Sequence, residues 1–235
     1  HPDPSSPPQT PGVGDHSAHM TKIRKITTAA GLSGLALNSA PEDLLSTINW
    51  DVPGSLLKPG SRSVVSRVEI GKTSFVFKQY KSLGFHRRVR YALSRSRARQ
   101  SWQNGQIMAD LGLPIVRPLA FFEECHWGIP GRALLIMPFQ KGTPLNEYST
   151  PEKVAPFLKE VFQSMSRNRI THGDLKATNI LVDEHARPHF IDIDASMIHR
   201  SKASYLKARQ KDEARFQKNW QDTPNALKIF QTIFG

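Results

Sequence analysis

Apolar and polar residues alternate most regularly in one segment near the middle of the first half of the chain. Residues 64–70 and 73–80 are rich in β-branched and aromatic side chains and are separated by a Gly-Lys pair, which predicts a β-hairpin. Because neighbouring side chains of a strand point to opposite faces, Phe75 and Phe77 share one face and Lys78 lies on the other. The pattern therefore predicts a sheet with an apolar face and a lysine on its opposite side.

A helical period replaces this alternation in the second half of the chain. Thr150 is followed by Pro and Glu, which is typical of a helix start. The apolar positions that follow at helical spacing, and that we expect in a core, are Val154, Phe157, Leu158, Val161, Phe162 and Met165. Residues 205–220 and 226–234 predict two further helices. We therefore expect the second half to be mainly helical.

Three polar residues with a characteristic spacing interrupt this second half. Asp174 follows a His-Gly pair, Asn179 lies five residues later, and Asp192 follows Asn179 by thirteen residues. Short apolar runs at 180–182 and 189–191 flank a turn-prone segment, which predicts a hairpin that returns Asp192 to the edge where Asn179 lies. This spacing matches the H-x-D-x-x-x-x-N signature of kinases and the strand-borne Asp that follows it.

The three residue types are those that phosphoryl transfer requires. A kinase needs a carboxylate near the acceptor hydroxyl, and an amide and a second carboxylate that hold Mg²⁺ against the phosphates of ATP. We assign these roles to Asp174, Asn179 and Asp192 in that order. The alternative is that the His-Gly-Asp segment is an ordinary turn and that Asp192 and Asp194 are solvated carboxylates of an edge strand.

Other residues fit a nucleotide site. Lys78 lies where a kinase strand carries the lysine that contacts the α- and β-phosphates, although it could also be a solvated strand lysine. The apolar run that ends at Met137 predicts the last strand before an interlobe hinge. With Met137 as the gating side chain, the carbonyl of Pro138 and the N–H of Gln140 would meet the adenine. No G-x-G-x-x-G precedes the hairpin, and residues 58–63 are the candidate loop over the phosphates.

Length and composition fit one bilobal domain or two small ones. The chain has 235 residues, of which 38% are hydrophobic. Residues 1–19 contain five prolines and no Lys or Arg and end directly before Met20, so we expect them to be a disordered expression tag. We expect residues 20–139 to form a first lobe with an N-terminal extension and a basic helix. Residues 140–235 would form a compact second lobe with the catalytic and metal-binding loops.

A formal net charge of +12 indicates an anionic partner. Between Lys78 and Ala109 the sequence has no Asp or Glu, so its basic residues have no acidic partner at helical spacing within the segment. This charge could face nucleotide phosphates, a phosphorylated glycan, an anionic membrane or nucleic acid, or could form a solvated helix face. Sparse aromatic residues argue against nucleic acid. The arginines of this segment that could face such an anion are Arg87, Arg88, Arg90, Arg95, Arg97 and Arg99.

Cysteine content and hydropathy limit the cellular location. A single cysteine, Cys125, excludes an intramolecular disulfide, and no run of about 18 apolar residues exists that could span a membrane. Residues 20–40 loosely imitate a secretory signal, but their Thr, Gly and Ser content makes a poor apolar segment. Because an enzyme that uses ATP needs the cytoplasm, we expect a cytoplasmic protein.

Several segments together carry a family resemblance. They are Phe-Val-Phe-Lys78, the Arg-rich stretch before Trp102, Gly-Leu-Pro-Ile-Val-Arg-Pro-Leu at 112–119, His-Gly-Asp-Leu-Lys-Ala-Thr-Asn at 172–179 and Ile-Asp-Ile-Asp at 191–194. With them the chain resembles the lipopolysaccharide core kinases, which phosphorylate heptose or Kdo sugars in Gram-negative bacteria. The resemblance implies that Lys176 reaches the γ-phosphate during transfer. It implies, too, that the protein is peripheral at the inner membrane, where the arginines named above would hold an anionic glycolipid or the membrane surface. It also implies that Asp194 is either a second metal contact or a solvated acid.

The chain departs from this family at one position. The family's helix usually offers a Glu just before the Trp, able to pair with the strand lysine, whereas Ser101 stands here. Either Lys78 is held by Asp192 and the nucleotide alone, or the helix is set differently, or activity is reduced.

We therefore expect an α+β, bilobal protein-kinase-like fold, with a small antiparallel-sheet N-lobe and a compact, mainly helical C-lobe. The expected activity is transfer of the γ-phosphoryl group of ATP, with Mg²⁺, to a sugar hydroxyl of the lipopolysaccharide inner core. Two alternatives stay open. One is a RIO-like atypical protein kinase, and the other is a pseudokinase or anionic-ligand binding module, whose salt-sensitive binding would survive loss of Asp174 and Asp192.

Overall fold

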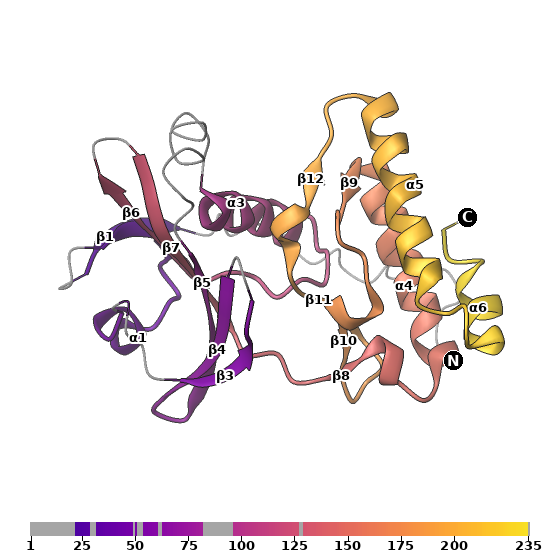
Figure 1. Ribbon diagram of the computed structural model, residues 1–235, viewed down its shortest axis with the longest axis horizontal. Coiled ribbons are helices and arrows are strands. Elements are labelled where there is room, and N and C mark those ends of the chain that lie inside the picture. Colours follow the sequence, from indigo (N-terminus) through magenta and orange to yellow (C-terminus); the bar gives the residue numbers. More distant parts are fainter. Residues whose placement is uncertain are drawn as a thin grey trace, which may run out of the picture.

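An antiparallel sheet forms the first lobe of this computed structural model, which describes residues 22–28, 32–48, 50, 54–60, 63–81, 96–126 and 129–234 (Figure 1). Within these ranges the sheet has seven strands in the order β1-β2-β6-β7-β5-β4-β3. The strands are β1 (Ile23–Thr27), β2 (Ser33–Leu37), β3 (Ser55–Lys58), β4 (Ser63–Ile70), β5 (Thr73–Tyr80), β6 (Ala120–His126) and β7 (Ile129–Pro138). The hairpin predicted from residues 64–80 is the β4–β5 pair.

Two helices cover opposite faces of this sheet. Phe75 and Phe77 of β5 belong to a cluster that includes Leu44 of α1 (Glu42–Ser46). Tyr80 of the same strand belongs to a second cluster with Trp102 of α3 (Arg97–Asp110). Because side chains alternate along β5, Lys78 lies on the face of Tyr80, beneath α3. The predicted separation of the phenylalanines from the lysine is thus confirmed.

Three helices form most of the second lobe: α4 (Pro151–Arg167), α5 (Lys202–Lys218) and α6 (Pro224–Phe230) (Figure 1). Their apolar faces meet in one core, in which the ring of Phe162 packs edge-on against Phe190 and Phe216 at centroid distances of 6.0 and 5.8 Å. The shorter elements are β8 (Thr143–Pro144), η1 (Leu145–Glu147), β9 (Ile170–Thr171), η2 (Ala177–Asn179), β10 (Ile180–Val182), β11 (Pro188–Phe190), η3 (Ile193–Ala195) and β12 (Met197–Ile198).

The β10–β11 hairpin fixes the position of the polar residues at its open end. Ile180 pairs with Phe190, so the chain enters the hairpin from Asn179 and leaves it toward Asp192 at the same edge. The backbone N–H of Ile191 donates to the carbonyl of Asn179 at 2.9 Å, which extends the pairing by one step. The predicted return of Asp192 to Asn179 is confirmed.

The segment after α3 connects the two lobes. Phe190 of β11 donates its backbone N–H to Pro114 and accepts the backbone N–H of Val116, at 2.7 and 3.1 Å. Ile115 forms a parallel bridge with the same strand residue. Helix α3 is therefore attached to the hairpin that carries the predicted metal site.

Some local expectations differ from the structure. Thr150 makes no capping hydrogen bond at the start of α4. Residues 23–27 and 33–37, part of the segment that imitates a secretory signal, pair antiparallel as β1 and β2. Residues 1–19 lie outside the described residues. Of the predicted basic helix, the structure describes only the part from Arg97, so Arg87, Arg88, Arg90 and Arg95 lie outside it as well.

No helix in the described part of the chain has both the length and the apolar character needed to cross a membrane.

Candidate active site

Lys78 joins the two lobes through a pair of carboxylates. Its ammonium lies 2.6 Å from Oδ1 of Asp192 and 2.9 Å from Oδ2 of Asp194. The lysine side chain is only 7% exposed, so its charge requires partners of opposite charge. The structure thus brings the predicted phosphate-binding lysine to the predicted metal carboxylate.

Asp192 occupies a strained position at the end of the hairpin. Its backbone is left-handed, with φ of 58°, which is uncommon for a residue with a side chain. Burial opposes its ionisation, but the charge and hydrogen bond of Lys78 dominate, with help from Lys58, and lower the pKa of the Asp192 carboxyl below its ordinary value. The side chain is 32% exposed, so solvent reaches this carboxylate. A carboxylate that stays ionised and accessible to solvent is well suited to bind a cation.

Asp174 lies on the loop between β9 and β10, within reach of Asn179. The amide nitrogen of Asn179 donates to the backbone carbonyl of Asp174 at 2.9 Å and to its Oδ2 at 3.2 Å. This contact fixes the amide so that its nitrogen faces Asp174, leaving its oxygen as the atom suited to a cation. Lys176 lies 3.1 Å from Oδ1 of Asp174. The predicted catalytic residues are thus in mutual contact.

His172 supports this loop from within. It is fully buried, and its Nε2 lies 3.1 Å from the carbonyl oxygen of Ile191. Because a carbonyl only accepts, Nε2 carries the proton of this hydrogen bond. Burial lowers the pKa of His172, which favours the neutral ring. Its Nδ1 has no hydrogen-bond partner among the described residues, in agreement with an uncharged ring.

Helix α5 contributes two residues that the sequence reasoning missed. Oδ2 of Asp212 accepts the backbone N–H groups of His172 and Gly173, at 2.7 and 3.0 Å. Arg215 donates to the carbonyl of Gly173 at 2.8 Å and to Oδ1 of Asp174 at 2.7 Å. Asp212 could have been found from its helical spacing, because it lies four residues before the apolar Phe216 and so shares a face with it. The structure shows that both residues are buried. No local signal identifies Arg215.

Asp194 is enclosed and not solvated. Its side chain is 7% exposed. Oδ1 accepts the hydroxyls of Tyr80 and Ser101, at 2.7 and 3.0 Å, and Oδ2 contacts Lys78 and Arg97. Burial, followed by the charge of Asp194, raises the pKa of Tyr80, so its hydroxyl stays protonated as a donor. The expectation of a solvated acid at this position is wrong.

The predicted hinge residues lie where β7 leaves the sheet. Met137 packs against the cluster that contains Trp102 and Tyr80, as a gating side chain would. The backbone N–H of Phe139 donates to Ser74 of the neighbouring strand at 3.0 Å. Pro138 and Gln140, on either side of Phe139, are the residues predicted to meet adenine, and their contact with a nucleotide stays a prediction.

The candidate phosphate-covering loop connects β3 to β4. Lys58 of β3 pairs with Val65 of β4, which in turn pairs with β5. A Cβ on Gly60 would lie 2.5 Å from the carbonyl oxygen of Ser63, so the turn requires glycine there. Lys58 is close enough to lower the pKa of Asp192. Ser61 and Arg62 lie outside the described residues.

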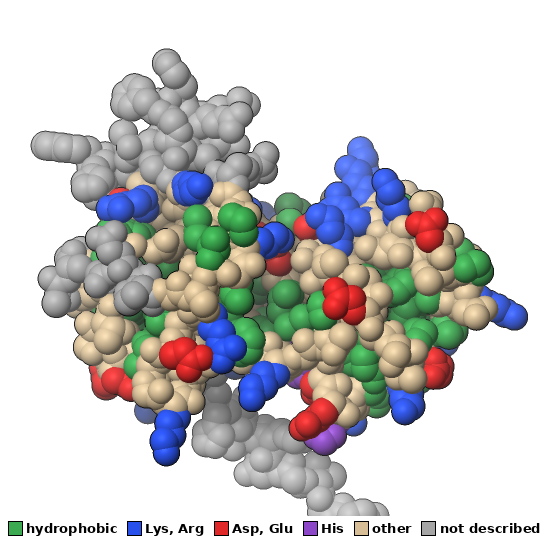
Figure 2. All heavy atoms as spheres, turned by 60° about the horizontal axis from the view of Figure 1, so that its bottom comes forward, with side chains coloured by type: hydrophobic (Ala, Val, Ile, Leu, Met, Phe, Trp, Pro, Cys, Tyr) green, Lys and Arg blue, Asp and Glu red, His purple; other side chains and the backbone are tan. Residues whose placement is uncertain are grey.

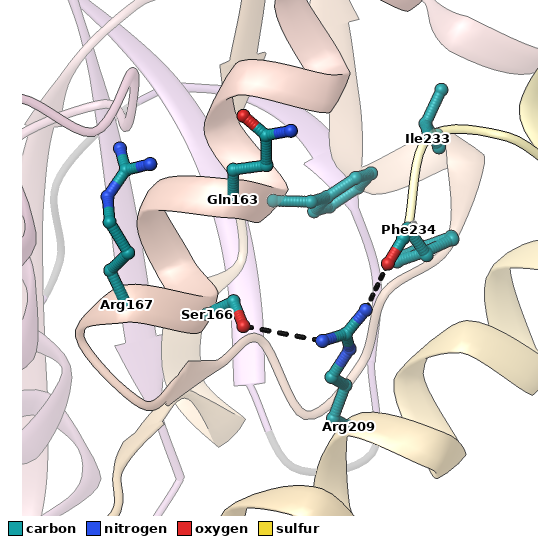
Figure 3. Close-up of a pocket in the computed structure, with 7 residues that line it drawn as sticks. Gln163, Ser166, Arg167, Arg209, Ile233 and Phe234 are labelled. Atoms are coloured by element: carbon teal, nitrogen blue, oxygen red, sulfur yellow. Dashed lines mark hydrogen bonds between the residues drawn. The ribbon is translucent and has the colours of Figure 1, made fainter.

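The surface between the lobes is hollowed, and Lys and Arg side chains lie along its margin (Figure 2). A separate cavity of about 380 Å³ lies between α4, α5 and the end of the chain. Figure 3 shows Arg209 in this cavity, where it donates to Ser166 and to the backbone carbonyl of Phe234. None of the predicted site residues lines it.

Comparisons with known proteins agree with this geometry. The model of the lipopolysaccharide kinase (Kdo/WaaP) family matches residues 57–229, well over half of the chain. This chain belongs to that family. The Kdo/WaaP family consists of kinases, so the protein is a phosphotransferase by membership. The match covers every residue assigned above to the site.

Solved structures support the fold of this Kdo/WaaP member. WaaP, in a structure titled as a complex with acyl carrier protein, has a TM-score of 0.57 and 15% sequence identity, and the alignment covers 78% of each chain. It confirms the α+β kinase-like fold. In total 1877 chains match, so the fold does not identify a substrate. No curated protein matches the chain.

The donor set fits Mg²⁺ and a nucleotide. Among the described residues, no three His, Cys, Asp or Glu side chains are grouped so that they could hold a metal. Mg²⁺ needs no such cage, because it is usually bound by one or two carboxylates together with phosphate oxygens and water. Asp192 and the amide oxygen of Asn179 are oxygen ligands of this kind. Lys78, beside Asp192, is suited to a phosphate.

Proposed function

We propose that this protein transfers the γ-phosphoryl group of ATP to a hydroxyl of a heptose or Kdo sugar in the lipopolysaccharide inner core. One observation carries the proposal: the 2.6 Å pair of Lys78 with Asp192, at the edge where Asn179 holds Asp174. These four residues come from two lobes and are the groups that a kinase needs together. Family membership supplies the acceptor class.

Each residue then has a distinct task. ATP with Mg²⁺ would supply the phosphoryl group and the charge that neutralises its oxygens. Asp192 and Asn179 bind the cation, and Lys78 binds the phosphates from the β5 side. Asp174 orients the acceptor hydroxyl and takes its proton, while Lys176 reaches the transferred group.

The adenine of ATP binds at the hinge, to Met137, Pro138 and Gln140. Arg215 restrains the Asp174 carboxylate from the opposite side.

The basic surface would receive the anionic glycolipid and the inner-membrane surface. Two of the arginines expected there are engaged within the protein: Arg97 contacts Asp194 at 3.0 Å, and Arg99 contacts Glu123 at 2.7 Å. Both remain 47% exposed, so each keeps surface for a ligand. Membrane contact through the remaining four arginines stays a prediction, because they lie outside the described residues.

The deciding experiment is mass analysis of unphosphorylated lipopolysaccharide core after incubation with the protein, ATP and Mg²⁺. Asp174→Asn removes the carboxylate that would take the proton. Asp222→Asn, at an exposed position of the same lobe, is the matched control. We expect a gain of one phosphate with the unsubstituted protein and with Asp222→Asn only. Separate acceptors that end in Kdo or in heptose distinguish the two sugars.

The other outcomes point to other functions. Clear ATP binding without any phosphate on the core, but with phosphorylated Ser, Thr or Asp on protein, would support a RIO-like kinase. ATP or anion binding that is unaffected by Asp174→Asn and Asp192→Asn, with no transfer to any acceptor, would support a binding module.

A further inference from the structure

A serine stands on α3 where a carboxylate would be expected to pair with Lys78. Ser101 is completely buried, and its hydroxyl donates to Oδ1 of Asp194 at 3.0 Å. The other oxygen of Asp194 lies 2.9 Å from the ammonium of Lys78. A carboxylate is therefore present beside Lys78 after all, but it comes from η3 and reaches the helix through Ser101.

The oxygens of Asp194 are fully used by protein donors. Tyr80 and Ser101 donate to Oδ1, and Lys78 and Arg97 contact Oδ2. An ionised carboxylate offers about four lone-pair sites, so these four partners saturate it. A cation could bind Asp194 only if one of these buried donors lost its partner, which is costly.

Asp192 has the opposite character. Its side chain is 32% exposed, whereas that of Asp194 is 7% exposed. Asp192 is therefore the carboxylate that a cation can reach. Once it binds one, its contact with Lys78 weakens, and Asp194 is the carboxylate of the described residues that still contacts the lysine.

Packing explains why the helix carries small residues here. A Cβ on Gly105, one turn after Ser101, would lie 3.1 Å from Cδ1 of Ile193, and closer still to Pro118. Helix α3 thus lies against Pro118 and η3 without space for a side chain at position 105. A glutamate at position 101 would compete with the Asp194 carboxylate for one space.

We propose that Asp194 is the counter-ion that positions Lys78 for the phosphates, in place of a helix glutamate, and that it is not a magnesium ligand. This inference rests on the proposed ATP-dependent function and assigns a positioning residue to the same site. Asp194 also connects β5, α3 and η3, because Tyr80, Ser101 and Lys78 all contact it.

The test relocates the carboxylate. Asp194→Asn removes the charge with little change of shape. The double variant Ser101→Glu/Asp194→Ala removes the carboxylate from η3 and supplies one from α3 in the space that is vacated. The single variant Asp194→Ala is its reference. Asp192→Asn is the comparison for a metal ligand. Two quantities are measured on each folded variant: the affinity for ATP at saturating Mg²⁺, and the Mg²⁺ concentration at half-maximal ATP binding.

We expect Asp194→Asn to weaken ATP binding by about tenfold or more, since Lys78 loses a charged partner, without a change in the Mg²⁺ midpoint. Asp192→Asn should raise that midpoint. The double variant should recover a large part of the ATP affinity that Asp194→Ala alone loses. A purely structural role would not be restored by a carboxylate that comes from another element.

Two results would overturn the inference: a Mg²⁺ midpoint raised by Asp194→Asn as much as by Asp192→Asn, or a folded double variant that binds ATP no better than Asp194→Ala. If the double variant does not fold, as circular dichroism would show, the Mg²⁺ midpoint of Asp194→Asn decides alone. These readouts need no sugar acceptor. If the protein binds ATP but phosphorylates no sugar, the proposed acceptor is refuted, and the binding data still decide the role of Asp194. If the protein shows no Mg²⁺-dependent ATP binding, the proposed function and the role of Asp194 are both refuted.

Discussion

Oδ2 of Asp212 accepts the backbone N–H of His172 at 2.7 Å, across 40 positions of sequence. The same oxygen accepts the N–H of Gly173, so one carboxylate oxygen satisfies two consecutive donors of the catalytic loop. Both residues immediately precede Asp174. The loop conformation, and with it the direction of the Asp174 carboxylate, therefore depends on helix α5.

Replacement of Asp212 tests this dependence. Asp212→Ala leaves two backbone N–H groups without an acceptor and should lower the free energy of unfolding by about 2–4 kcal/mol. Asp212→Asn keeps one oxygen, which is all that the two donors use, and should cost about 1 kcal/mol. Chemical denaturation measures both. Equal losses in the two variants would show that the charge of Asp212 matters and that hydrogen-bond acceptance does not.

Gly173 is held in a conformation that other residues resist. Its φ is +78°, and a Cβ there would lie 2.2 Å from the carbonyl oxygen of Ala195. Gly71 has a similar φ of +58° in the β4–β5 turn but nothing within 4 Å of its Cβ position. Gly71→Ala should therefore cost about 1 kcal/mol from backbone strain alone. Gly173→Ala should cost about 1–3 kcal/mol more, because atoms are forced into occupied space.

Thermal and chemical unfolding of these two glycine variants separates the effects. Phosphotransfer should be lost in Gly173→Ala and kept in Gly71→Ala. Similar stability and activity of the two variants would mean that η3 moves away from the loop at little cost.

The local parts of this fold were predictable from sequence. The β4–β5 hairpin follows from the alternation at residues 64–70 and 73–80, and the β10–β11 hairpin from two apolar runs on either side of a turn-prone segment. The spacing of Asp174, Asn179 and Asp192 is short enough for one loop and one hairpin to determine their geometry. Such features depend on contacts between residues that are close in the sequence, so the local sequence pattern is enough to predict them.

The remaining contacts join distant segments. Tyr80 and Asp194 are separated by 114 positions, and Ser101 and Asp194 by 93. The sequence shows Ser101 and no acid at this place in α3, but it does not show that Asp194 contacts Lys78, because the packing of η3 against α3 determines that contact. The sequence therefore did not show how the charge of Lys78 is balanced.

Arg215 is expected to act on catalysis through Asp174 and not through the nucleotide. Its NH1 group lies 2.7 Å from Oδ1 of Asp174 and restrains that carboxylate. Arg215→Ala should lower kcat by about tenfold or more, since small displacements of a catalytic group are costly, with little change in ATP affinity. Lys211→Ala, at an exposed position of the same helix, is the charge-matched control. A variant that binds ATP poorly but turns over normally would contradict this role.

The buried His172 should make stability depend on pH. Burial lowers its pKa from the ordinary 6.5, so below that pH the unfolded chain binds a proton that the folded protein resists. Stability attributable to this ring is fully present above pH 6.5 and is lost as the pH falls toward the folded-state pKa, by at most about 1.4 kcal/mol for each pH unit.

His172→Gln keeps an N–H donor for Ile191 but cannot titrate, so its melting temperature should fall less steeply between pH 6.5 and 5 than that of the unsubstituted protein. His185→Gln, which replaces an exposed ring of the same lobe, is the matched control. Parallel slopes for all three proteins would show that His172 accepts its proton in the folded state as readily as in the unfolded one.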